Sequence, residues 1–173
     1  MKFTSIALAA LVFAATGQAH ENEAKEKAEA AKNAPALATA MREASVSLAS
    51  GLSASESEGT PISGKFELEN GKLQLSVYTM KDGKFFEVVV DHKTGKIAKT
   101  EPITSGEDLE AAKNQAAGMA KATHSLRDVV AKAEQANAGY HAVSVTAELE
   151  GGAAEADLSL LKGAQSKHVE EKL

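Results

Sequence analysis

The sequence contains no cysteine and no tryptophan, and only 4% of its residues are aromatic. Without cysteine the chain cannot form disulfides, use a thiol as a nucleophile or bind a metal through thiolates. With so few aromatic residues, any hydrophobic core has to be built from aliphatic side chains and is modest. The formal net charge is −5 and the lysines are scattered among glutamates, which argues against a nucleic-acid partner, because phosphate binding needs a basic patch.

Recognised catalytic motifs are also missing. His92, His124, His141 and His168 do not stand in an H-E-x-x-H motif, and no nucleophile elbow or phosphate-binding loop surrounds them. We therefore expect a noncatalytic protein that has no cofactor.

The N-terminal segment 1–19 has the pattern of a secretory signal peptide. Lys2 precedes an apolar run over residues 6–15, and small residues at positions 17 and 19 predict cleavage after Ala19. The run is too short to span a bilayer, and no second apolar run follows it. We expect a periplasmic or secreted protein that has no membrane anchor after cleavage.

Residues 20–35 form a charged, alanine-rich leader or linker. Large apolar side chains are missing from residues 21–33, so this segment has little to bury. After cleavage His20 would be the first residue, and its amine and imidazole together are a candidate copper ligand pair. The alternative is a histidine that has no ligand role, because the sequence places no second histidine beside it.

The most regular stretch runs from Ile62 to Lys99 and contains three alternating segments. Asn70-Gly71 and Asp82-Gly83 separate the segments, and such dipeptides supply the positive φ angles of hairpin turns. The alternation directs one apolar set towards a core: Phe66, Leu68, Leu73, Leu75, Val77, Phe86, Val88 and Val90. Three exceptions, Tyr78, Phe85 and Val89, point outwards. They are ordinary cross-strand neighbours, residues covered by the second half of the chain, or contacts for a partner.

An apolar stripe before these segments predicts one helix. Its members are Leu37, Met41, Ala44, Leu48 and Leu52, spaced by three or four residues. A corresponding stripe in the second half consists of Met119, Ala122, Leu126, Val130 and Ala133. We expect each helix to pack on the apolar face of its own strands.

The second half repeats the first at a shift of 81 residues. This shift aligns ISGKFELENG (62–71) with VSVTAELEGG (143–152), which share five identities. No turn like DHKTGK appears in the second copy, so we expect its third strand to be short. The predicted fold is α+β, with two tandem small modules, each an α-helix packed on a short antiparallel β-meander. Repeat 1 covers residues 36–105 and repeat 2 covers residues 106–173.

The order of helix, strand, GK, strand, DGK, strand and D-x-x-T-G-K resembles the PepSY domain. It stands here as GKFELENGKLQLSVYTMKDGKFFEVVVDHKTGKIAK, within a region from Leu37 to about Ile103. The second copy resembles the family less well and is incomplete or degenerate. PepSY modules occur in the propeptides of thermolysin-type metallopeptidases and restrain the peptidase. The resemblance therefore implies an inhibitor or chaperone-like regulator of an extracytoplasmic peptidase or another envelope protein.

An exposed strand edge is the binding mechanism that we expect for such a module. A short meander leaves an edge to which an extended segment can add, and Tyr78, Phe85 and Val89 would supply side-chain contacts. If the second repeat covers that edge, this mechanism is lost. The alternative function is a periplasmic binder of a metal ion or another small ligand, in which a metal site would depend on histidines.

Overall fold

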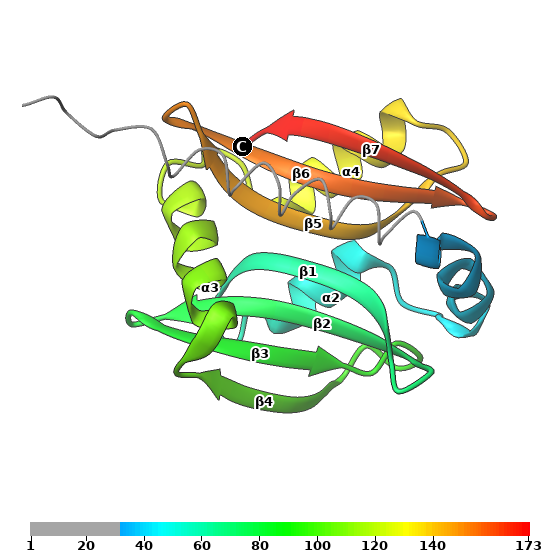
Figure 1. Cartoon of the computed structure of the whole chain (residues 1–173), viewed down its shortest axis with the longest axis horizontal. Helices are drawn as coiled ribbons and strands as arrows, with labels where there is room; N and C mark the ends of the chain where they lie inside the picture. The colour runs from blue at the N-terminus through cyan, green and yellow to red at the C-terminus, as the bar shows by residue number, and fades with distance from the viewer. Residues whose placement is uncertain (1–31) are drawn as a thin grey trace, which may run out of the picture. The chain divides into compact units, whose positions relative to one another are not determined.

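Seven antiparallel strands form a single sheet in the computed structural model, which describes residues 32–173. The predicted signal peptide and His20 lie outside the described residues. The strand order is β4-β3-β2-β1-β5-β6-β7 (Figure 1). The strands are β1 (Thr60–Glu69), β2 (Lys72–Lys81), β3 (Lys84–Val90), β4 (Ile97–Ile103), β5 (His141–Glu150), β6 (Ala153–Lys162) and β7 (Gln165–Lys172). The α+β class is confirmed, but the two halves share one sheet.

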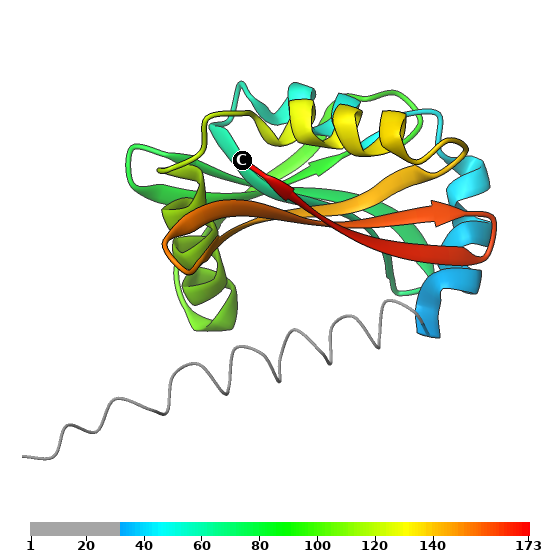
Figure 2. The ribbon, with the colours of Figure 1, turned by 90° about the horizontal axis from the view of Figure 1, so that it is seen from above.

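Helices cover the two faces of this sheet unequally. Helices α2 (Leu48–Ser55) and α4 (Leu126–Ala136) lie together on one face, as Figure 2 shows from above. Helix α3 (Gly106–Met119) crosses the other face at one end. Residues 34–40 are helical and continue into a short 3-10 helix, η1 (Met41–Glu43).

The prediction of one unbroken helix in each half is wrong. The chain leaves the helical conformation at residues 44–47 and again at residues 120–125. Ser47 and Ser125 then begin α2 and α4, because each hydroxyl accepts a hydrogen bond from the backbone N–H three residues later. The apolar stripe runs across both breaks because the segments on either side face the same core, so periodicity alone does not reveal them.

The expectation of a short third strand in the second half is also wrong. β7 pairs with β6 from Gln165 to Lys172, and its register repeats that of β3 on β2 at the shift of 81. The β1–β2 and β5–β6 pairs also have equivalent registers, including an irregularity after Pro61 and after Ala142. Among the strands of the described residues, β4 alone has no counterpart in the second half.

The two halves meet where β1 pairs with β5. Only three residue pairs form there, and the central pair is Gly64 with Val145. Adding 81 to 64 gives 145, so the sheet has an internal twofold relation that passes through this pair. The second half therefore covers the inner edge of β1, as in the alternative in which the second repeat covers the strand edge.

The sizes of side chains at this centre are complementary. A Cβ atom at Gly64 would lie 3.1 Å from Cδ2 of Leu52 in α2, so the glycine makes room for the leucine. The equivalent positions in the second half hold Val145 on the strand and Ala133 on the helix, and both are fully buried. The first half thus combines a small strand residue with a large helix residue, and the second half combines a large strand residue with a small helix residue.

The predicted apolar face largely forms the core. Phe66, Leu75, Val77, Val88 and Val90 are buried, whereas Leu73 and Phe86 are only partly buried. Leu68 remains 36% exposed and its counterpart Leu149 remains 41% exposed. Each lies beside a hairpin turn at a strand end.

We predict that Gly64→Val lowers the free energy of unfolding by roughly 2 kcal/mol, because its side chain would overlap that of Leu52. The double variant Gly64→Val/Leu52→Ala reproduces the residue pair of the second half. In the Leu52→Ala background, Gly64→Val should therefore cost much less stability than it does in the unaltered chain. Urea denaturation of the two single variants and the double variant measures the coupling. Additive losses would contradict the proposed size exchange.

Candidate functional site

The sheet surface opposite α2 and α4 is the candidate site, and we call it the polar face. Strand register places its side chains in rows across the sheet. α3 reaches it at one end, where Ser63 Oγ donates a hydrogen bond of 2.8 Å to Gln115 Oε1. Residues on this face include Lys65, Glu67, Ser76, Tyr78, Phe85, Glu87, Val89, Glu148, Asp157, His168 and Glu170.

All three predicted contact residues lie on the polar face. Tyr78 is half-buried beneath the Lys65 amine, which lies 5.8 Å from its ring centroid. Phe85 pairs across the sheet with Met80 and Ile103, and Val89 lies four residues further along β3, with Glu87 between them. The three side chains therefore do not form one continuous apolar patch, and their binding role stays a prediction.

A hydrogen-bonded network holds the charged groups beside Tyr78 in place. Lys65 Nζ lies 2.8 Å from Glu67 Oε2. Ser76 Oγ, which is fully buried, lies 3.0 Å from Glu67 Oε1 and 2.9 Å from Glu87 Oε1. A hydroxyl has one proton, so Ser76 donates to only one of these carboxylates at a time. The amide of Gln74 donates to Ser76 Oγ at 2.9 Å.

The environment of this network shifts two pKa values. Burial raises the pKa of Tyr78 to about 12, although the nearby charge of Lys65 opposes the shift; the charges of Glu87, Glu67 and Asp108 reinforce it. Burial pulls the pKa of Lys65 down, but the hydrogen bond with Glu67 and the surrounding negative charge outweigh it and raise this pKa. At neutral pH the face therefore presents a neutral phenol next to a charged amine.

The second half carries a different set of groups at the equivalent positions. Subtracting 81 relates Asp157 to Ser76, His168 to Glu87 and Glu170 to Val89. His168 Nε2 lies 2.7 Å from Asp157 Oδ2, and these side chains are 31% and 15% exposed. One ligand atom each from Asp157, His168 and Glu170 lies within 4.8 Å of the others, and imidazole with carboxylates is a donor set that suits Zn²⁺. Among residues 32–173, no other three such donors come this close.

The sequence contains a signal for this cluster, which was not predicted. Ser76 pairs with Val89 on β2 and β3, so the shift of 81 predicts that Asp157 pairs with Glu170. The expected short third strand hid that pairing, because it left His168 near the C-terminus without a place in the sheet.

Comparisons with known proteins found no relatives. No protein-family model matches the chain, and neither a curated protein nor a solved structure matches it. In the part of the chain that the structure describes, none of the helices has the length and apolar character needed to cross a membrane.

The pKa of Tyr78 gives a direct test of the network. Tyr140→Phe leaves Tyr78 as the sole tyrosine, and its phenolate absorbance should rise with a midpoint at about pH 12. Because the folded protein holds the phenol neutral, the resulting stability is present below pH 10 and is lost as the pH rises through 12. A midpoint near 10 in the folded protein would contradict the buried position of this ring.

Proposed function

We propose that this protein is a noncatalytic, exported binding module that holds another extracytoplasmic protein on its polar face. The observation that carries the proposal is the preorganised network of Lys65, Glu67, Ser76 and Glu87 around a half-buried tyrosine. Fixed side chains lose little conformational entropy on binding, and tyrosine contributes large contact areas in interfaces. By its resemblance to PepSY modules, the partner is an extracytoplasmic peptidase, which this protein inhibits or chaperones.

Recognition through this face is better supported than addition of a strand. The inner edge of β1 is paired with β5, so it cannot accept an extended segment. The outer strand β4 contains Pro102 together with Lys99 and Glu101, and proline and lysine are typical means of blocking an edge. β7 carries charged residues over most of its length.

The charge of the polar face favours a basic surface on the partner. Carboxylates outnumber amines along its rows. The amines belong to Lys65, Lys99 and Lys172, and the carboxylates belong to Glu67, Glu87, Glu101, Glu148, Glu155, Asp157 and Glu170. Complementary charge steers association and aligns the two surfaces. A partner segment that combines lysine or arginine with an apolar residue for the Tyr78 region fits this pattern.

A photo-crosslinker placed at Val89 in the host cell tests this surface. We expect a covalent adduct with a peptidase, and we expect none from the matched position Ala131, which is exposed on α4 on the opposite side of the sheet. Glu87→Lys should reduce the adduct several-fold because it reverses a charge directly opposite Tyr78 on the neighbouring strand. Equal adducts from both positions, or no adduct from Val89, would exclude the polar face as the binding surface.

A second candidate function is binding of a metal ion. The cluster of Asp157, His168 and Glu170 favours it, because three donors of the right chemistry already lie together on neighbouring strands. This site is distinct from the copper pair expected at His20, which lies outside the described residues.

Calorimetric titration of the full chain with zinc chloride tests the cluster. His168→Asn should weaken binding at least roughly tenfold, since it removes the one nitrogen donor. His124→Asn changes an exposed histidine outside the cluster and should leave binding unaltered. Undiminished binding by the His168 variant would show that this cluster does not hold the metal.

A further inference from the structure

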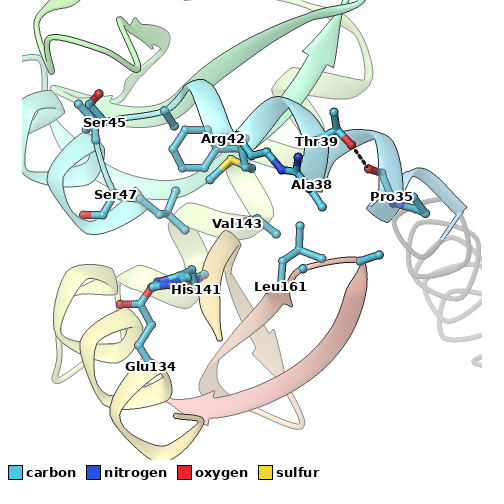
Figure 3. A pocket seen from close by; sticks show the side chains of 18 residues that line it. Pro35, Ala38, Thr39, Arg42, Ser45, Ser47, Glu134, His141, Val143 and Leu161 are labelled. Carbon is cyan, nitrogen blue, oxygen red and sulfur yellow. Dashed lines mark hydrogen bonds between the residues drawn. The ribbon is translucent and has the colours of Figure 1, made fainter. Parts of the chain in front are cut away.

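A cavity of about 500 Å³ lies between the N-terminal helical segment and the second half of the sheet. Residues 35–42 line one side, and the start of β5 with the β6–β7 turn lines the other (Figure 3). Its volume lies in the range of small-molecule sites. It is separate from the polar-face network and from the Asp157, His168 and Glu170 cluster, since none of those residues lines it.

The walls of this cavity are mainly apolar. Met41, Leu48, Phe66, Val143 and Leu161 line it, and they come from five different elements or turns. An apolar chain or ring that entered would leave water for aliphatic and aromatic contacts, which is favourable in proportion to the area buried.

One cationic group at the cavity has no hydrogen-bond or ion-pair partner among residues 32–173. Arg42 belongs to η1 and makes no hydrogen bond or ion pair within the part of the chain described by the structure. A guanidinium in this position can bind a carboxylate through two parallel hydrogen bonds. The other arginine, Arg127, lies 3.4 Å from Glu56 and does not line the cavity.

The one carboxylate at the cavity is already engaged. Glu134 projects from α4 beside His141, and its Oε1 accepts a hydrogen bond of 2.8 Å from the backbone N–H of Ala142. Figure 3 shows Glu134 and His141 on the side of α4, whereas Arg42 belongs to the helical segment on the other side. A ligand carboxylate at Arg42 would therefore be held away from the like charge.

The two halves differ at a residue that controls how closely a helix can approach the sheet. In the second half, α3 lies directly on β5, because a Cβ at Gly118 would be only 2.6 Å from the backbone oxygen of Glu148. The equivalent residue in the first half is Leu37, and a leucine cannot approach the backbone so closely. We therefore expect segment 34–40 to lie further from the sheet than α3.

We propose that this cavity binds a medium-chain fatty acid, with the carboxylate on Arg42 and the alkyl chain among the apolar walls. This ligand uses both features of the cavity: the Arg42 guanidinium, which has no partner among residues 32–173, and the mainly apolar lining. The site gives the protein a small-molecule ligand in addition to the protein partner proposed for the polar face, and neither depends on the other.

Calorimetric titration of the full chain with sodium decanoate, below its critical micelle concentration, tests the proposal. We expect one site per chain. Arg42→Gln should weaken binding roughly tenfold or more, because a charge-assisted hydrogen bond is lost. Arg127→Gln is the matched control and should bind as the unaltered chain does. Decanol has the same chain without the charge and should bind at least roughly tenfold more weakly than decanoate.

A second variant separates loss of the site from loss of folding. Ala164 lines the cavity at the exposed β6–β7 turn, so Ala164→Phe should fill the mouth and abolish binding while circular dichroism remains unaltered. No binding by the unaltered chain, equal binding of decanoate by Arg42→Gln, or equal affinity for decanol would each overturn the proposal.

Discussion

The short pairing between β1 and β5 is the constraint on which the rest of the molecule depends. Three residue pairs join two halves of three and four strands into one sheet, and Gly64 stands opposite its own counterpart Val145. Because the same register recurs in both halves, this single junction sets the positions of all seven strands. It also brings α2 and α4 together on one face, where Leu52 and Ala133 complement the strand residues beneath them.

The two faces of the sheet then have different physical roles. One face is closed by α2 and α4 and contains the aliphatic core, which compensates for the scarcity of aromatic residues. The other face is crossed by α3 at one end, so its charged side chains satisfy each other through direct contacts such as Lys65 with Glu67. The core face stabilises the fold, and the opposite face carries the charged groups. Stability therefore does not depend on the polar character of that opposite face.

Local chemistry made much of the first half predictable. Asn70 and Asp82 adopt positive φ angles of 51° and 52°, as their hairpin turns require, and the alternation of the strands assigns Tyr78, Phe85 and Val89 to the correct face. The helix breaks were not predicted, because Ser47 and Ser125 act through caps that leave the apolar period intact. Coverage of a strand edge by the second repeat is only an alternative at the sequence level, and the β1–β5 pairing that provides it joins residues far apart in sequence, with no local signal to mark it. The cluster of Asp157, His168 and Glu170 lies within the β6–β7 hairpin and depends on a full-length β7, and the expected short third strand left two of its members without a place in the sheet.

The placement of the junction also has a consequence for the order of folding. Two-residue turns close the β1–β2, β2–β3, β5–β6 and β6–β7 hairpins, whereas Gly64 and Val145 are separated by 81 positions along the chain. Closing a long loop costs more entropy than closing a short one, and distant contacts slow folding. The centre of the finished sheet is therefore expected to form late, after the hairpins on either side have assembled. Until that step, β1 and β5 both present unpaired edges, so the partly folded chain is most vulnerable to aggregation at the position that finally becomes its most protected.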